Sequence, residues 1–232
     1  MSIGFRVVTD IPRAEPALVE RLSRCRSCDI SDVLNRSGTM VGIRPVYLPI
    51  APVAGRAVTV SIPAGGINVV KLGIEQARAG DVIVVSAQGE TTYAMIGGNI
   101  ALGMQARGIV GFVIDGAVRD VSELRELAFP TFARGIATAA ADLGGPRGEV
   151  NVPIACGGVV VNPGDIVVAD EDGIVVVPPS IAADVAAGVG ELNAKHAQAR
   201  EVLRRGEVTS IEQITRDYVA LGMELARTDE RD

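Results

Sequence analysis

Two charged residues, Arg119 and Asp120, stand side by side just past the apolar stretch IVGFVID at 109–115. That stretch predicts a buried strand, and α/β proteins bind ligands in the loops at the carboxyl ends of such strands. The planar fork of an arginine suits a carboxylate or an enolate oxygen. An aspartate is a hard oxygen ligand suited to Mg²⁺ or Mn²⁺. Glu123, on the same face of the next predicted helix, can reinforce such a site.

A second feature with chemical potential is the glycine pair Gly97–Gly98, which precedes a predicted helix at 99–107. The first N–H groups of a helix have no intrahelical acceptor and lie at the positive end of the helix dipole. Glycine lets a carboxylate or a phosphate come close to these donors. The helix start is therefore suited to an anion, and it can face the same pocket as Arg119 and Asp120.

Both features also have a structural interpretation. A Gly–Gly pair at a helix start is more often a tight turn, and an Arg–Asp pair often caps a helix, here with Asp120 as the N-cap. On spacing alone the structural interpretation is favoured.

The CxxC pair, Cys25 and Cys28, is a further candidate for metal or redox chemistry. A zinc site needs more Cys or His ligands at matching spacing, and only Cys156 and His196 remain, far along the chain. The pair also falls late in a predicted helix and not after a strand, as a thioredoxin-like motif requires. We therefore interpret it as structural.

The elements that must position Arg119 and Asp120 alternate between strand and helix. Apolar periodicity and glycine or proline stops predict the following elements: helix 15–38, with a second short helix starting near 29–31, short strands within 41–62, helix 67–79, strand 79–87, a loop QGETT, helix 99–107, strand 109–115, helix SELRELAFP and strand TFARGI. Such alternation with continuous apolar strands predicts a layered α/β fold with buried strands.

The second half of the chain changes character. The stretch GEVNVPIACGGVVVNPGDIVVADEDGIVVVPP predicts short strands between Gly, Pro and Asp turns. A long helix and a shorter one near EQITRDYVALGMELA follow. We predict a domain at 1–178 and a helical extension at 179–232 that suits an oligomer contact.

Composition narrows the class of protein. The 232 residues are long enough for a sizeable core, the formal net charge is −6, and 48% of the residues are hydrophobic. Nothing resembles the basic footprint of a nucleic-acid binder. No segment has the ~18 apolar residues of a membrane span, and the N-terminus lacks an apolar signal core. We expect a cytoplasmic protein that binds neither nucleic acid nor membrane.

The segments GGNIA, IDGAVRDVSEL, AFPTFARG and GEVNVPIACGGVVVNPGDIVVADEDGIVVVP resemble the RraA-like family, and the likeness covers residues 28–178 almost without interruption. That family contains divalent-metal 4-hydroxy-4-methyl-2-oxoglutarate / 4-carboxy-4-hydroxy-2-oxoadipate aldolases and regulators of ribonuclease activity. The resemblance implies a swivelling-domain-like fold, with central mixed sheets, flanking helices and C-terminal helices.

The resemblance also assigns roles to residues. Arg119 matches the arginine that binds substrate and steadies the enolate, and Asp120 matches the carboxylate that holds Mg²⁺ or Mn²⁺. The backbone amides of Gly98, Asn99 and Ile100 match those that bind the pyruvyl carboxylate. Gly98 is a departure, because the family pattern has an aspartate at this position.

Some family members reach from the C-terminal helix into a neighbouring subunit's site. The family residue is a glutamate. Here HAQAREVL places His196 near that position, with Glu191 and Glu201 close by, so the choice among the three stays open. His196 in trans can shuttle protons. The resemblance implies a homotrimer or homohexamer.

The function implied is that of a class II pyruvate aldolase, a lyase that cleaves a small 4-hydroxy-2-oxo acid to pyruvate and also decarboxylates oxaloacetate. The chain has only two lysines, Lys71 and Lys195, and neither position demands a Schiff base, so a metal route is economical. The rival interpretation is a non-catalytic regulator that binds a ribonuclease or a helicase.

Overall fold

The computed structural model describes residues 4–63, 66–145, 147–207 and 211–225. In this part of the chain the strands are β1 (Phe5–Val7), β2 (Arg44–Pro45), β3 (Val53–Ser61), β4 (Asp81–Ile96), β5 (Gly111–Val118), β6 (Thr131–Ile136), β7 (Gly148–Val150), β8 (Ile154–Cys156), β9 (Val159–Val161), β10 (Ile166–Ala169) and β11 (Ile174–Val177). The helices are α1 (Pro16–Ser23), α2 (Ser27–Val33), α3 (Ile67–Gln76), α4 (Gly98–Ala106), α5 (Val121–Glu126), α6 (Ala182–Arg204) and α7 (Ile211–Ala220), with a 3₁₀ turn at Pro179–Ile181.

A mixed sheet forms the centre of the structure. Its strands follow the order β1-β7-β3-β4-β5-β6-β2, and β10 pairs with both β3 and β11. The pairs β3–β4, β4–β5 and β5–β6 are parallel, whereas β7 and β10 run antiparallel to β3 and β2 runs antiparallel to β6. This arrangement confirms the predicted layered α/β fold with a central mixed sheet.

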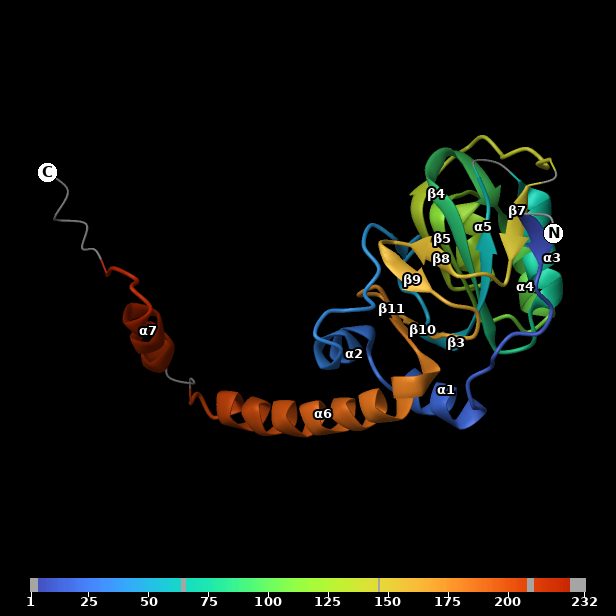
Figure 1. Ribbon diagram of the computed structural model, residues 1–232. Helices are drawn as coiled ribbons and strands as arrows, with labels where there is room; N and C mark the ends of the chain where they lie inside the picture. Colours follow the sequence, from blue (N-terminus) through green and yellow to red (C-terminus); the bar gives the residue numbers. More distant parts are fainter. Residues whose placement is uncertain (1–3, 64–65, 146, 208–210, 226–232) are drawn as a thin grey trace, which may run out of the picture. The chain divides into compact units, whose positions relative to one another are not determined.

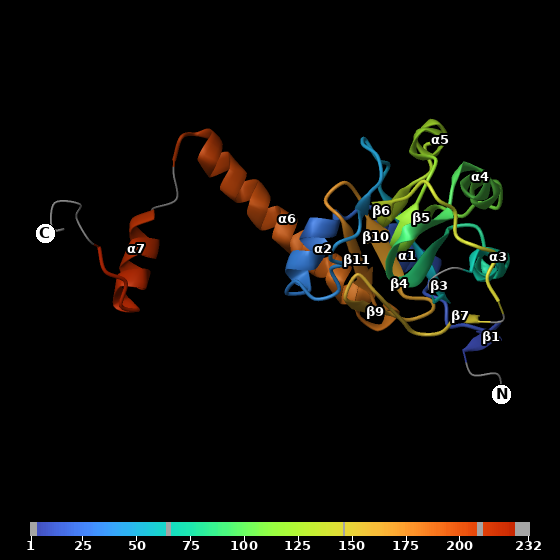
Figure 2. The same cartoon turned by 90° about the horizontal axis from the view of Figure 1, so that it is seen from above.

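Three consecutive crossovers place helices α3, α4 and α5 on one side of this sheet, as Figures 1 and 2 show. Each helix links two neighbouring parallel strands, and right-handed crossovers that progress in one direction along a sheet leave their helices on the same face. All eight residues of β5 are buried, which explains its continuous apolar sequence. The hairpin of β8 and β9 packs against β3 and β4.

A second apolar cluster covers the strands β10 and β11. It is built by α1, α2 and the start of α6, and includes Leu22, Ile30, Ala182, Val185 and Val189. The sequence predicts helix 15–38 with a second short helix starting near 29–31. The structure has two separate helices with residues 24–26 between them, and the second already begins at Ser27. Gly38, the predicted stop, does have positive φ, and a Cβ there would approach the carbonyl oxygen of Val176.

The QGETT segment is a second correction. The sequence predicts a loop after a strand at 79–87, but β4 continues through it to Ile96. The register with β5 shifts between Ser86 and Glu90, again between Glu90 and Ala94, and once more before Ile96. The polar segment is therefore part of one long strand, and the register shifts are its bulges. This strand leads directly to Gly97.

The chain divides into two compact units, residues 1–189 and 190–232. The division falls after the predicted domain boundary at 178, because the first turns of α6 bury Ala182, Val185 and Val189 in the first unit. In the second unit, none of the described residues is buried. Nowhere in the described ranges is there a helix long and apolar enough to cross a membrane, and the cytoplasmic location stays a prediction.

Candidate functional site

The neighbouring strands β4 and β5 bring the two features singled out in the sequence together. Because these strands are parallel, Gly97 after β4 and Arg119 after β5 emerge at the same edge of the sheet. The backbone N–H of Arg119 donates to the carbonyl oxygen of Ile96 at 3.0 Å, so the ladder continues past the end of β5. The helix start and the strand end therefore lie next to each other, and their sharing of one pocket stays a prediction.

Asp120 has an unusual backbone conformation at the start of α5. Its φ of 59° and ψ of 43° lie in the left-handed region, which few residues other than glycine adopt and which is often found at functional sites. It occupies the N-cap position, but its side chain makes no capping hydrogen bond to α5. Instead, its Oδ2 accepts a hydrogen bond from the N–H of Gly98 at 3.1 Å. A simple helix cap therefore does not account for this side chain.

The arginine of the pair stays beside the carboxylate. Arg119 Nε lies 3.6 Å from Asp120 Oδ2, and the two side chains are 44% and 35% exposed. Both groups are thus accessible to a small ligand. At that exposure the ion pair adds little to the stability of the fold, which leaves the guanidinium available for another anion.

Gly97 and Gly98 make room for two carboxylates. A Cβ at Gly97 would overlap Oδ2 of Asp120, and a Cβ at Gly98 would overlap Oε2 of Glu123 and lie 2.9 Å from Glu123 Cβ. The glycine pair therefore permits the first turns of α4 and α5 to approach closely. Glu123, predicted to reinforce the site, lies at the start of α4 beside the very position where the family pattern has an aspartate.

Two of the three predicted amide donors remain available. The N–H of Gly98 is bonded to Asp120, whereas within the described ranges no acceptor meets the N–H of Asn99 or Ile100. Asn99 is exposed, Ile100 is half-buried, and both lie in the first turn of α4. These two amides can bind one carboxylate at the positive end of the helix dipole.

The donor set at this edge fits a hard divalent cation. Asp120 supplies a carboxylate oxygen beside Gly97, and Glu123 supplies one beside Gly98. Within the described residues no group of three or more His, Cys, Asp and Glu side chains is placed to hold a metal. Mg²⁺ and Mn²⁺ characteristically use one or two protein carboxylates and complete their shell with water and substrate oxygens. The residues present fit that pattern, whereas a closed structural zinc site does not fit.

The remaining predicted residues lie elsewhere. His196 is half-buried on α6, in the second compact unit, and its role in trans stays a prediction. Cys25 and Cys28 are free thiols that are not joined in a disulfide. Burial, and next the carboxylate of Asp29, raise the pKa of both. Raised thiol pKa values disfavour the reactive thiolate, in agreement with the structural interpretation of the CxxC pair.

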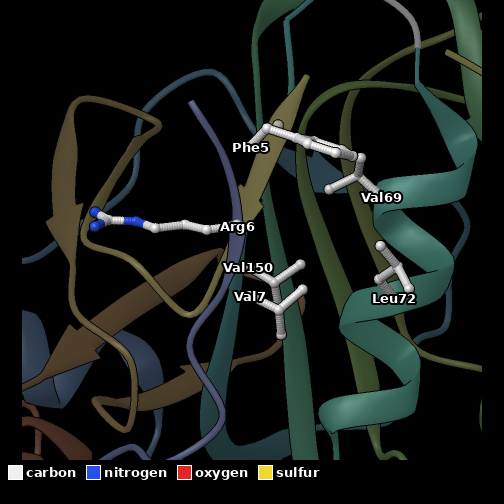
Figure 3. Close-up of a pocket in the computed structure, with 7 residues that line it drawn as sticks. Phe5, Arg6, Val7, Val69, Leu72 and Val150 are labelled. Atoms are coloured by element: carbon white, nitrogen blue, oxygen red, sulfur yellow. The ribbon is translucent and has the colours of Figure 1, made fainter. Parts of the chain in front are cut away.

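An apolar cavity of about 150 Å³ lies between the edge strand β1 and helix α3. Phe5, Val7, Val69 and Leu72 face it in Figure 3, while the side chain of Arg6 points away and pairs with Glu149. Among the described residues, no acid, base or nucleophile lines this cavity. It does not contribute to the chemistry at Asp120.

The ion pair of Asp115 and Arg134 escaped the sequence analysis. Asp115 lies in the strand β5 and is only 9% exposed, and its Oδ1 accepts a hydrogen bond from Nε of Arg134 in β6. The signal available in the sequence was a carboxylate inside an otherwise apolar strand, which is costly to bury unless it is paired.

The family model described as RraA-like: Aldolase/RraA matches residues 27–176. A protein of Halalkalibacterium halodurans, provisionally named as a 4-hydroxy-4-methyl-2-oxoglutarate aldolase, is 46% identical over 54% of this chain and 60% of its own length. The 4-hydroxy-4-methyl-2-oxoglutarate aldolase of Thermus thermophilus is 35% identical over 66% of this chain and 92% of its own.

Among solved structures, Streptomyces coelicolor RraAS2 is described as an unusual member of the RNase ES inhibitor RraA protein family. It superposes with a TM-score of 0.72 at 30% identity, over 84% of this chain and 99% of its own. The fold, the matched segment and these relatives agree, and the chain belongs to the RraA-like family.

Proposed function

We propose that this protein is a divalent-metal-dependent class II aldolase, a carbon–carbon lyase that cleaves 4-hydroxy-2-oxo acids of the 4-hydroxy-4-methyl-2-oxoglutarate type and releases pyruvate. The observation that carries the proposal is the position of Asp120. Its side chain leaves its own helix uncapped and lies at the start of α4, beside an accessible arginine. The names of the relatives support an aldolase activity in this family.

Each residue at the site has a defined task in this proposal. The N–H groups of Asn99 and Ile100 bind the carboxylate next to the 2-oxo group. Arg119 donates from its guanidinium to the oxygen on which negative charge develops as the pyruvate enolate forms. The two amides are fixed by the backbone of α4, so they need little rearrangement when the substrate binds.

Asp120 would hold the cation, with Glu123 in support. When bound, Mg²⁺ or Mn²⁺ supplies Lewis acidity at the 2-oxo group. The left-handed backbone of Asp120 directs its carboxylate toward α4 and away from its own helix. That orientation is the contribution of the protein chain itself.

The same set of residues supports decarboxylation of oxaloacetate as a second activity. Loss of CO₂ from that acid produces the same pyruvate enolate, and it needs no base to remove a hydroxyl proton. Arg119 therefore has the same task in both reactions. Because Gly98 lacks the carboxylate of the family pattern, proton removal from a 4-hydroxyl group has one candidate base fewer here.

The test is pyruvate release, measured with a coupled lactate dehydrogenase assay. The purified protein is incubated with 4-hydroxy-4-methyl-2-oxoglutarate or with oxaloacetate, in the presence of Mg²⁺, Mn²⁺ or EDTA. We expect pyruvate release from both acids, and we expect EDTA to abolish this release. Arg119→Lys should retain part of the activity and Arg119→Ala very little, because only the first keeps a cation. If neither acid releases pyruvate with Mg²⁺ or with Mn²⁺, the proposed enzymatic activity is refuted.

A second candidate function is regulation of RNA decay. The Streptomyces relative is described as belonging to an RNase inhibitor family, and a chain of this family can inhibit a ribonuclease or a helicase by docking, without catalysis. The net charge of −6 permits such a role but does not select it. Co-purification with a ribonuclease by a protein that shows no pyruvate release would favour this alternative.

We also propose that the protein is a homo-oligomer, a trimer or a hexamer. In the second unit, Ile211, Ile214 and Tyr218 recur at intervals of three and four residues on α7, and all are more than half exposed. Such an apolar stripe is normally covered by another helix. Light scattering after gel filtration should give three or six times the chain mass of 24.0 kDa. In such an assembly His196 of one copy can serve the site of another, and His196→Ala should then lower turnover.

A further inference from the structure

Arg134 is held by a carboxylate that lies in the sheet. Asp115 is 9% exposed and uses both of its oxygens: Oδ1 accepts a hydrogen bond from Nε of Arg134, and Oδ2 accepts one from the N–H of Gly157 at 3.0 Å. Burial by itself raises the pKa of Asp115, but the bonds from Arg134 and Gly157 together lower it below its usual value. Asp115 is therefore ionised at neutral pH and fixes the guanidinium by its Nε edge.

The other end of the guanidinium has no partner. Its only ion pair in the described part of the chain is the one with Asp115, and no acceptor in that part meets Nη1 or Nη2. The side chain of Arg134 is 35% exposed, so these nitrogens are open to a ligand. An arginine held at one edge and free at the other presents two parallel donors, the arrangement that matches a carboxylate.

Two glycines lie near the Arg134 guanidinium. Gly42, with φ of +78°, lies so close that a Cβ there would be 2.6 Å from Nη1. A Cβ at Gly89 would be 3.8 Å from Nε. Gln88 and Gly89 both have left-handed backbone at the first bulge of β4. Gly89 is one of the residues 87–91 that line a polar cavity of about 360 Å³, which places this cavity near the Nε edge of Arg134.

One internal competitor has to be considered, since Glu90 also lines that cavity. Its Oε1 accepts a hydrogen bond from the N–H of Thr92, and bonds from Thr92 lower its pKa. No ion pair within 4.0 Å joins it to Arg134. The other titratable group near Arg134 is Cys156, whose burial raises its pKa to about 12, so that it is uncharged.

We infer that Arg134, anchored by Asp115, is the centre of a second anion-binding site, separate from the Asp120 site, that takes the carboxylate of a small organic acid through Nη1 and Nη2. This inference goes beyond the proposed aldolase and does not depend on it. Arg134 lies in β6, and the carboxylate that anchors it, Asp115, is not one of the residues of the Asp120 site.

The experiment is a titration of the isotopically labelled full-length protein with succinate at constant ionic strength, followed by ¹H–¹⁵N NMR. We expect saturable shifts of the Gly42 and Gly89 amides and of the Arg134 Nε–H signal. Arg134→Gln should weaken this binding by ~10-fold or more, and Arg134→Lys by less, because lysine keeps the charge but loses the two-donor geometry. Glu90→Gln should tighten binding by ~2-fold or more, because it removes a negative charge beside the anion.

The matched control is Arg44→Gln. Arg44 lies in the neighbouring strand β2 and donates to the carbonyl oxygen of Asp172 instead of a carboxylate. This variant should bind succinate like the unmodified protein. Shifts that persist in Arg134→Gln, or that fail to saturate and are reproduced by chloride, would overturn the inference. A folded spectrum of each variant serves as the check that Asp115 tolerates the loss of its partner.

Discussion

The side chain of Asp120 accepts a hydrogen bond from the backbone N–H of Gly98 at 3.1 Å, across 22 positions of the sequence. This contact joins the first turn of α5 to the first turn of α4 and gathers the polar groups of the candidate site. It is possible because Asp120 has a left-handed backbone and because position 97 carries no side chain that would block its oxygen.

The first prediction concerns Asp120 itself. Asp120→Asn keeps the shape of the side chain and tolerates the left-handed backbone, but it removes the charge that would hold a cation. We expect pyruvate release to fall by ~100-fold or more and Mn²⁺ binding, measured by electron paramagnetic resonance, to weaken. The side chain is 35% exposed, so the free energy of unfolding should change by less than about 1 kcal/mol. If Asp120→Asn no longer bound Mn²⁺ but kept full activity, Asp120 would not be part of the active site.

The second prediction concerns the glycine that replaces the family aspartate. Gly98→Asp should lower stability by about 1–3 kcal/mol, because its Cβ would overlap Glu123 and its carboxylate would face two others. Replacing Glu123 at the same time, in Gly98→Asp with Glu123→Ala, should recover stability. Urea denaturation of the two single variants and the double variant measures the coupling. Simple additivity would show that Glu123 does not occupy the space at position 98.

The third prediction concerns the CxxC pair. Cys25→Ser and Cys28→Ser should leave pyruvate release unchanged, because both thiols have raised pKa values and neither lies at the Asp120 site. The assay is the same coupled measurement, carried out with and without a reductant. A large loss of activity in either variant would restore the redox interpretation.

The fourth prediction concerns acid stability. The net pKa of Asp115 is lowered in the folded protein, so its ion pair with Arg134 contributes stability above the carboxyl pKa of the unfolded chain, ~3.9. That contribution is lost as the pH falls through the lower folded pKa. Asp115→Asn should therefore be less stable than the unmodified protein at pH 7, with a difference that shrinks toward pH 3. Thermal unfolding of both proteins between pH 7 and pH 3 measures this difference. A difference in stability that stays constant with pH would contradict the prediction.

Much of the fold could be predicted from the sequence. Short continuous apolar runs such as 109–115, bounded by turn residues, are typical of strands buried on both sides, and the helices between them bury one face each. The strand at TFARGI and the helix near 99–107 are confirmed within one residue. The prediction was wrong where local signals were ambiguous. The second short helix expected near 29–31 begins at Ser27, and the polar segment QGETT is part of β4. QGETT is extended because pairing with a neighbouring strand outweighs local composition.

The chemical candidates were determined by the sequence alone. Arg119, Asp120 and Glu123 follow a buried strand, and Gly97 and Gly98 precede a helix, so residue types and positions in the chain were sufficient to single them out. What the sequence left undecided was whether Asp120 caps its own helix. That choice depends on the backbone conformation of one residue and on the place of α4 beside α5.

Tertiary structure decided those points. Parallel pairing of β4 with β5 sets the two helix starts at one edge, and only then can the Asp120 carboxylate reach Gly98 and the Glu123 carboxylate fill the space beside it. The pairing of Asp115 with Arg134 was also invisible in the sequence, since the two residues are joined only by the register of β5 and β6. Contacts of this kind depend on distances between strands, which no local pattern contains.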